Sequence, residues 1–475
     1  MMTLYQPDLL YADGRFLAQT GLLVADDGVI VGILPNTEPP PVGCEIIRLA
    51  GKAVLPGFAN THSHSFQRLI RGKTESRRSN GRDFWDFWSW RGAMYHAAAS
   101  LEPEDVYHVA RITFLEMALA GTTTVGEFHY LHRRPNGKSY DDPNLLARRV
   151  IAAAESVGIR IALLRAAYQR PGYGLPSDPG QARFLETTDE FVANTENLHR
   201  EYRSGGAWIG VAPHSVRAVP LDALTEIVGW ARQHSLPVHM HVSEQSAEVA
   251  ACQEEYGATP VRLLAQHKLL GSDFTAVHAI HIDADEMDLL AASGATICSC
   301  PTTERNLGDG IVLARAVMER GIPVAFGSDS QAQIDSLEDA RELDYHLRLQ
   351  QQQRAVLDQI DGEEMSTRLF QCATKNGAEA LNSSSALSQK SGMLQHGNAA
   401  DFFTVDLADP SIAGSEPETL LPLIVFGLQR TAIADVVVGG RFVIRDHTHP
   451  AQQEILTQYQ EVYRKVWRAP HLAMQ

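Results

Sequence analysis

Four apolar segments in the middle of the chain each end in histidine or aspartate, and this repetition constrains the fold more than any other feature. The residues at or just beyond their ends are His62 and His64, His241, His278, and Asp329. Two residues separated by one other residue on a strand point to the same side, so the His-x-His pair can bind one metal ion. Active-site residues at the carboxyl ends of several parallel strands are typical of a (β/α)8 barrel. One such strand end can arise by chance, but four in order indicate a barrel.

The middle of the chain alternates apolar runs with helical patterns, which is typical of a parallel sheet. Eight runs over about 270 residues match the usual size of a barrel. The predicted strands are Val54–Ala59, Thr122–Glu127, Arg160–Ala166, Trp208–Ala212, Pro237–His241, Phe274–His278, Ala295–Cys300 and Pro323–Gly327. Predicted helices between them include Pro103–Leu119, Leu221–His234 and Asp285–Ser293. A Rossmann fold is disfavoured because no Gly-x-Gly-x-x-Gly follows a strand.

The two ends of the chain differ from the middle, because short alternating segments there are separated by glycine, aspartate and proline turns. That pattern indicates antiparallel strands and hairpins. Residues 1–56 and 392–448 are therefore predicted to form one small β domain. Residues 57–391 are predicted to form the metal-dependent barrel, and residues 449–475 a C-terminal helical segment. The predicted fold class is α/β.

Composition excludes several classes of protein. No apolar run approaches about 20 residues, so we expect no membrane span, and the N-terminus lacks the pattern of a signal peptide. The net charge of −16 argues against a nucleic-acid partner. Five scattered cysteines indicate reduced thiols in a cytoplasmic protein. Cys298 and Cys300 are better explained as alternating residues of a strand than as a metal-binding pair.

The order of the polar strand ends resembles that of the amidohydrolase superfamily. In that resemblance the His-x-His pair follows the first strand, His241 the fifth, His278 the sixth and Asp329 the eighth. It covers essentially the whole chain and implies a β-sandwich, built from both termini, beside a (β/α)8 barrel. No lysine stands where it would bridge two metals, so the chain resembles the mononuclear deaminase branch. The His-x-x-Glu of that branch is matched by residues 241–244.

Several short segments resemble the formimidoylglutamate deiminases, a family of iminohydrolases in histidine degradation. They are residues 62–68, 87–91, 126–130, 214–219, 306–310 and 327–330. This resemblance implies hydrolysis of N-formimidoyl-L-glutamate to N-formyl-L-glutamate and ammonia. Two departures keep open the alternative of a nucleobase, nucleoside or pterin deaminase. Residues 71–90 are longer and more basic than is usual for that family, and the segment 300–306 begins with Cys-Pro, as in purine and pterin deaminases.

The residue types and the resemblance together give a set of metal ligands: His62, His64, His241 and Asp329. Three imidazoles and one carboxylate suit one divalent ion, and we expect Zn²⁺. Such an ion lowers the pKa of water from about 15.7 towards 7, which gives a strong nucleophile at neutral pH. Taken alone, Asp329 would be interpreted as a turn residue or a helix N-cap and not as a ligand. Its place after the eighth strand, with three histidines elsewhere, favours a ligand that is also part of the catalytic set.

Two more residues are expected to take part in catalysis. Glu244 can take a proton from the attacking water and pass it to the leaving nitrogen. His278 can form a hydrogen bond to the developing tetrahedral centre. His281 competes for this role, but His278 directly ends its apolar run. His239 lies deeper on the strand of His241 and is expected to be packed.

Formimidoylglutamate carries two carboxylates, so a chain with net charge −16 must supply cations at the site. Arg91 and Arg217 suit this role because a guanidinium group can bind both oxygens of a carboxylate. His214 and Tyr130 follow predicted strands, and Gln67 can donate a hydrogen bond to the amide-like end. We therefore expect a small dicarboxylate amidine as substrate. The complete ligand set argues against a non-catalytic protein that kept the fold.

The segment before Arg91 is basic and aromatic. Its basic residues predict a loop over the site: Arg71, Lys73, Arg77, Arg78 and Arg82. Its aromatic residues indicate that the loop is anchored in a subunit interface, and we expect a homodimer: Phe84, Trp85, Phe87, Trp88 and Trp90.

Overall fold

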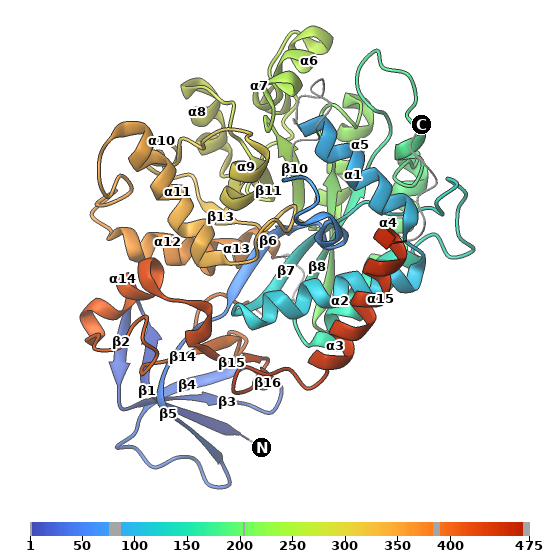
Figure 1. Ribbon diagram of the computed structural model, residues 1–475. Coiled ribbons are helices and arrows are strands. Elements are labelled where there is room, and N and C mark those ends of the chain that lie inside the picture. The colour runs from blue at the N-terminus through green and yellow to red at the C-terminus, as the bar shows by residue number, and fades with distance from the viewer. Residues whose placement is uncertain (1, 76–86, 203–204, 383–389, 469–475) are drawn as a thin grey trace.

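The computed structural model describes residues 2–75, 87–202, 205–382 and 390–468. These residues contain a parallel barrel and a separate sheet made from the two ends of the chain (Figure 1). The eight barrel strands follow chain order around the barrel. They are β6 (Phe58–Ser63), β7 (Thr122–His129), β8 (Arg160–Ala167), β9 (Ala207–Pro213), β10 (Val238–Val242), β11 (Phe274–His278), β12 (Thr296–Ser299) and β13 (Val324–Phe326). The predicted fold class is confirmed.

The barrel closes where β13 meets β6. The N–H of Asp329 donates to the carbonyl of His62 at 3.0 Å, and the N–H of His64 donates to the carbonyl of Asp329 at 3.0 Å. Gly327 permits this close approach, because a Cβ atom there would lie 2.7 Å from Cβ of His62. Barrel closure therefore holds three of the predicted ligands next to one another through their backbones.

The first strand was predicted in the wrong place. Residues Glu45–Pro56 form β5, which belongs to the terminal sheet, and the barrel strand β6 begins only at Phe58. The run of apolar residues here is buried on both faces, so its sequence has no alternation of polar and apolar residues that would show where one strand ends and the next begins. The break falls at Gly57, where a Cβ atom would collide with the side chain of Thr123. The other predicted strands end within two residues of β7 to β13.

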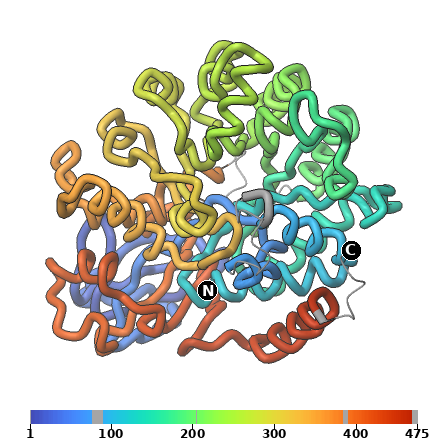
Figure 2. The backbone as a smooth tube through the Cα atoms, turned by 45° about the horizontal axis from the view of Figure 1, so that its top comes forward, coloured from blue at the N-terminus to red at the C-terminus, as the bar shows by residue number. Residues whose placement is uncertain are grey.

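Helices surround the barrel as an outer ring (Figure 2). They include α1 (Phe87–Ser100), α2 (Pro103–Leu119), α3 (Leu145–Val157), α4 (Thr188–Glu201), α5 (Leu221–Gln233), α6 (Ser246–Tyr256), α7 (Pro260–Gln266), α8 (Ala284–Ser293), α9 (Pro301–Leu307), α10 (Ala314–Met318), α11 (Ser336–Gln351), α12 (Met365–Ala373) and α13 (Lys375–Leu381). Short 3₁₀ turns are η1 (Ser65–Ile70), η2 (Pro179–Gln181) and η3 (Arg430–Ala432). The three helices named from sequence correspond to α2, α5 and α8. A capping box between Glu102 and Asp105 and a proline at the first turn start α2 at the predicted residue.

The two ends of the chain form one hydrogen-bonded sheet in the order β16-β15-β14-β5-β1-β3-β4, with β2 beside β1. Its strands are β1 (Thr3–Ala12), β2 (Arg15–Ala18), β3 (Thr20–Val24), β4 (Ile30–Pro35), β5, β14 (Phe402–Asp406), β15 (Ile433–Val438) and β16 (Arg441–Ile444). The sheet curls on itself, because the Tyr5 hydroxyl donates to the carbonyl of Gly440 at 2.6 Å and the Tyr5 ring packs on Phe402. Helix α14 (Pro417–Gly427) connects β14 to β15. The exact domain limits stay predictions.

Helix α15 (Gln452–Arg468) crosses back to the barrel and packs against α2 (Figure 1). Lys465 pairs with Asp105 at 2.5 Å, and Arg111 pairs with Glu454 at 2.7 Å. Among the described residues, no helix combines the length and apolar character that a membrane crossing requires.

Candidate active site

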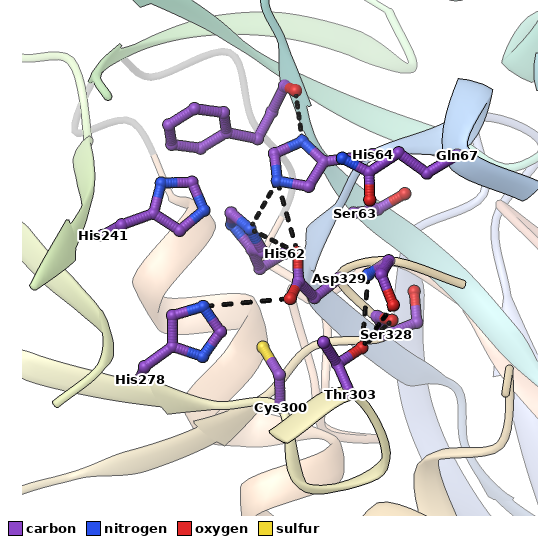
Figure 3. A network of polar contacts seen from close by, with 12 residues as sticks. His62, Ser63, His64, Gln67, His241, His278, Cys300, Thr303, Ser328 and Asp329 are labelled. Carbon is purple, nitrogen blue, oxygen red and sulfur yellow. Dashed lines mark hydrogen bonds and ion pairs between the residues drawn. The ribbon is translucent and has the colours of Figure 1, made fainter. Parts of the chain in front are cut away.

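The four predicted ligands meet at the carboxyl end of the barrel. His62, His64, His241 and Asp329 each offer a ligand atom within 4.8 Å of the others, and all four are buried. The Nε2 atoms of His62 and His64 lie 3.1 Å apart. Oδ1 of Asp329 lies 3.4 Å from the first of these atoms and 3.3 Å from the second (Figure 3). The side chains converge on one point that a cation can occupy.

Backbone carbonyls fix the orientation of two of the rings. Nδ1 of His64 lies 2.9 Å from the carbonyl of Phe128, and Nδ1 of His241 lies 2.9 Å from the carbonyl of His214. A carbonyl can only accept, so each Nδ1 carries the proton and each Nε2 presents a lone pair to the centre. This is the tautomer that binds a metal ion.

The electrostatic environment favours the same protonation states. Burial, with neighbouring positive charge, lowers the pKa of His62 to about 3 and that of His241 well below its usual range. Burial raises the pKa of Asp329, but hydrogen bonds with His62 and His64 and the charge of His278 outweigh this effect and hold its pKa well below the usual range. Imidazole Nε2 atoms that approach to 3.1 Å next to a charged carboxylate fit a divalent cation.

A buried carboxylate that we did not predict holds the end of β6. Glu127 accepts from the Ser63 hydroxyl at 2.6 Å, and from the N–H and hydroxyl of Ser65 at 2.7 and 2.6 Å. Gln331 donates to the Ser63 hydroxyl at 2.9 Å. These contacts fix the residues on both sides of His64. The sequence could have revealed Glu127, because it is a glutamate inside an apolar strand. A buried carboxylate needs hydrogen-bond donors around it.

The backbone is strained where several barrel strands end. Ser243, His278, Asp329 and Gln331 have φ of 52°, 71°, 43° and 62°, in the left-handed region that disfavours non-glycine residues. Each such residue costs about 1–3 kcal/mol and persists only where its surroundings hold it. The strain turns the chain sharply after β10, β11 and β13 and directs side chains into the mouth of the barrel.

Glu244 and His278 lie beside the ligand cluster, as the sequence predicts. Nε2 of His278 is 4.0 Å from Oε1 of Glu244 and 3.8 Å from Oδ2 of Asp329. Burial raises the pKa of Glu244 above its usual range, as suits a group that both accepts and releases a proton. His281 instead faces the carbonyl of Asp309 at 3.0 Å.

His239 is packed deeper in the barrel. Its Nε2 lies 3.0 Å from the carbonyl of Ala380, and its side chain is fully buried. It is not part of the ligand cluster.

The residues predicted to bind substrate share one cavity with the cluster. Its lining includes Gln67, Arg91, Tyr130, His214 and Arg217. His64, His241, Glu244 and Asp329 line the same cavity. Elements far apart in sequence are thus brought together, namely η1, α1 and the loops after β7 and β9.

Tyr168 connects the two arginines, and the sequence analysis missed it. Its hydroxyl accepts from Arg91 at 3.2 Å and from Arg217 at 3.1 Å. Arg91 also donates to the Tyr95 hydroxyl at 2.5 Å. With both guanidinium groups donating to its oxygen, the Tyr168 O–H is left to donate to another group. Tyr168 directly follows β8, so the rule that selected Tyr130 after β7 would have found it.

Gln67 contacts Tyr130, and its predicted role in binding substrate stays a prediction. Its Nε2 donates to the Tyr130 hydroxyl at 2.7 Å, and its Oε1 is buried with no hydrogen-bond partner among the described residues. The amide nitrogen carries a second N–H, so Gln67 keeps the capacity to donate, and its Oε1 can also accept.

The predicted basic loop is described only at its two ends. Arg71 pairs with Glu116 at 2.8 Å, and Lys73 lies over the rings of Tyr463 and Trp467. Residues 76–86, which include Arg77, Arg78, Arg82, Phe84 and Trp85, lie outside the described residues, as do the side chains of Phe87 and Trp88. The loop over the site and the homodimer stay predictions.

Comparison with known proteins agrees with this fold and site. The amidohydrolase family model matches residues 53–443. The chain is 36% identical over 431 residues to formimidoylglutamate deiminase of Pseudomonas aeruginosa, covering 90% of this chain and 92% of that protein. It is 28% identical to 5-methylthioadenosine/S-adenosylhomocysteine deaminase of Shouchella clausii, covering 91% of each. The solved structure of an amidohydrolase from Brucella melitensis superposes with a TM-score of 0.86 at 31% identity, covering 98% of this chain and 99% of that one.

The chain belongs to the amidohydrolase family. The fold, the buried histidine and aspartate cluster and these relatives define a hydrolase that acts on carbon–nitrogen bonds of a small molecule.

Proposed function

We propose that this protein hydrolyses N-formimidoyl-L-glutamate to N-formyl-L-glutamate and ammonia, using one divalent metal ion. The observation that carries the proposal is the pair Arg91 and Arg217, joined through Tyr168 in the cavity of the ligand cluster. Two guanidinium groups suit a substrate with two carboxylates. The name and the 36% identity of the Pseudomonas aeruginosa relative support the same substrate.

His62, His64, His241 and Asp329 would hold the metal ion, and their nitrogen and oxygen atoms suit Zn²⁺. Such an ion would lower the pKa of a water molecule and polarise the substrate carbon. The carbonyls of Phe128 and His214 keep the Nε2 atoms of His64 and His241 directed at this position.

Glu244 moves the proton in this proposal. Its carboxylate takes a proton from the attacking water and delivers it to the terminal nitrogen of the formimidoyl group. The hydroxyl group of the tetrahedral centre then gives its proton to Glu244, which passes it to the same nitrogen. The carbon–nitrogen bond breaks, the carbonyl forms, and the nitrogen leaves as ammonia. His278 lies 4.0 Å from Glu244 and can donate from Nε2 to the oxygen that develops negative charge. The raised pKa of Glu244 supports a role in which it holds a proton between the two transfers.

The other end of the cavity orients the substrate. Arg91 and Arg217 bind the carboxylates, and a charge-assisted hydrogen bond of this kind contributes roughly 1.5–3 kcal/mol. The Oε1 of Gln67, which has no hydrogen-bond partner among the described residues, accepts from the formimidoyl N–H, while the amide nitrogen donates to Tyr130. His214 has a pKa held well below its usual range by burial and by Arg217, so it faces the substrate as a neutral ring.

A second cavity favours the alternative of a nucleoside or related deaminase. It borders the first, with which it shares His214, Arg217, His241 and Glu244. Tyr173 and Leu175 line its outer part and are about half exposed. A substrate larger than formimidoylglutamate would fit there, and the Shouchella clausii relative is named for 5-methylthioadenosine and S-adenosylhomocysteine.

Ammonia release from a panel of substrates separates the two functions. The panel contains N-formimidoyl-L-glutamate, N-formimidoyl-L-aspartate, N-formimidoylglycine, 5-methylthioadenosine, adenosine, guanine and isoxanthopterin. We expect the largest kcat/KM for N-formimidoyl-L-glutamate, with no ammonia from the ring substrates. Efficient release from a ring substrate and none from the formimidoyl compounds would replace the proposal with the alternative.

A further inference from the structure

Asp329 takes part in a second group of potential metal ligands. His278, Cys300 and Asp329 are buried, and each offers an atom within 4.8 Å of the other two. Oδ1 of Asp329 faces His62 and His64 at 3.4 and 3.3 Å, whereas Oδ2 faces Nε2 of His278 at 3.8 Å. The carboxylate therefore presents one oxygen to each group of ligands.

His278 is oriented in the way that is typical of a metal-binding histidine. Its Nδ1 lies 3.3 Å from Oε1 of Glu304. That carboxylate is held in turn by the N–H of Cys300 at 2.7 Å and by the Ser299 hydroxyl at 3.1 Å. A carboxylate at Nδ1 fixes the tautomer and makes Nε2 a better ligand.

The Nε2 atom of His278 is buried and has no hydrogen-bond partner among the described residues. It points towards Asp329, and the sulfur of Cys300 points to the same region (Figure 3). A buried polar atom without a partner costs about 1–3 kcal/mol. The carboxylates of Asp329 and Glu244 approach this nitrogen only to 3.8 and 4.0 Å, so it is available to a group from outside the protein, which is the substrate in the proposed reaction or a metal ion.

We propose that Cys300, His278 and Asp329 form a second, inhibitory site for a thiophilic divalent cation such as Zn²⁺, with Asp329 bridging the two ions. A thiolate, an imidazole and a carboxylate select zinc, cobalt or cadmium over magnesium or calcium. Binding displaces the thiol proton of Cys300 and the Nε2 proton of His278, and both pass to solvent, so no oxidant or reductant is required. Three protein ligands leave one position of a tetrahedral ion open.

Occupation of this site removes His278 from the reaction. Its Nε2 would be bound to the ion and no longer free to donate to substrate, and the added charge would lie near Glu244, 4.0 Å from that nitrogen. The first ion sustains activity, and the second, bound at higher metal concentration, suppresses it. This inference depends on the ligand cluster but not on which substrate the enzyme uses.

Cobalt titration of metal-free protein tests the proposal. Thiolate bound to Co²⁺ gives an intense charge-transfer absorption in the near ultraviolet, which imidazole and carboxylate ligands do not give. We expect two equivalents of Co²⁺ per chain, with the charge-transfer band appearing only as the second equivalent binds. Excess Zn²⁺ should inhibit wild-type ammonia release over the same concentration range.

Cys300→Ser and Cys298→Ala form a matched pair of variants, because Cys298 is equally buried but lies outside the ligand group. Cys300→Ser should bind the first equivalent as wild type does, lose the band, and bind the second at least about 10–100-fold more weakly, the loss seen when outer-shell partners alone are removed. Cys298→Ala should keep both equivalents and the band. Uptake of the first equivalent shows that each variant is folded.

Three outcomes would overturn the proposal. They are saturation of wild type at one Co²⁺ per chain, a charge-transfer band that appears with the first equivalent, and a band that persists in Cys300→Ser. Zinc inhibition that is unchanged in Cys300→Ser would also exclude Cys300 as a ligand of the inhibitory ion.

Discussion

The metal side and the substrate side of the site are built differently. His62, His241 and Asp329 lie on or just after barrel strands, and hydrogen bonds between β6 and β13 hold two of them together. The substrate side comes from η1, from α1 and from loops, where Arg91 and Arg217 both donate to the Tyr168 hydroxyl.

The positions of the metal ligands are thus set by the backbone of the fold, whereas the positions of the substrate-binding groups are set by contacts between side chains. Strand ends on a closed barrel can move little, so ligand geometry follows from the barrel itself. The arginines are long and flexible, so their positions depend on a few hydrogen bonds. Substitutions on the metal side should therefore abolish the reaction. Substitutions on the substrate side should lower kcat/KM by smaller amounts that depend on the contact removed.

The largest effect is expected at a ligand. His241→Gln should lose the metal ion and lower kcat by at least about 10³-fold, because a bound ion supplies several kcal/mol of transition-state stabilisation. Metal content by elemental analysis and steady-state kinetics measure both. His239→Gln, on the same strand, is the control and should keep the metal. Retention of the ion in His241→Gln would remove His241 from the ligand set.

Glu244→Gln should keep the metal ion and lose about 10²-fold or more in kcat, the contribution of a positioned proton-transfer group. The change preserves shape and removes only the proton-accepting charge. Glu254→Gln, an exposed carboxylate at the edge of the neighbouring cavity, should stay near wild type. Near-normal turnover in Glu244→Gln would mean that another group moves the proton.

Arg217→Met should lower kcat/KM for N-formimidoyl-L-glutamate by about 10–150-fold, from the loss of one charge-assisted interaction. The metal content should not change. Arg232→Met removes an arginine that pairs with Asp273 outside the cavity, and it should leave kcat/KM within about twofold of wild type. A similar fall of kcat/KM in both variants would mean that removing any arginine lowers activity, and it would not support a contact between Arg217 and substrate.

The smallest effect is expected at Tyr168. Tyr168→Phe removes one hydroxyl from between the arginines, and a neutral hydrogen bond contributes about 0.5–1.5 kcal/mol, so KM should rise about 2–10-fold with little change in kcat. Tyr173→Phe, at the exposed edge of the second cavity, is the control. An equal fall in kcat with constant KM would place Tyr168 in the chemical step.

The two sides were also predictable to different degrees. His241, His278 and Asp329 could be found because each follows an apolar run, and a barrel brings such ends together. Tyr168 and Glu304 act through contacts with residues that are distant in sequence or lie in a different element. No local pattern encodes these contacts, although the position of Tyr168 directly after β8 marks it as a candidate. The first strand was misplaced for a related reason, since Pro56 and Gly57 divide one apolar run between two sheets.

The carboxylate contact of Arg217 is the claim on which the proposed substrate most depends. The decisive measurement compares kcat/KM of wild type and Arg217→Met on N-formimidoyl-L-glutamate and on two analogues that each lack one carboxylate, N-formimidoyl-γ-aminobutyrate and the γ-amide N-formimidoyl-L-glutamine. The account predicts a drop of about 10–150-fold on the full substrate. It predicts a much smaller drop on the analogue that lacks the carboxylate bound by Arg217. Equal drops on all three substrates would contradict the account, because Arg217 would then support the fold of the cavity and not bind a carboxylate.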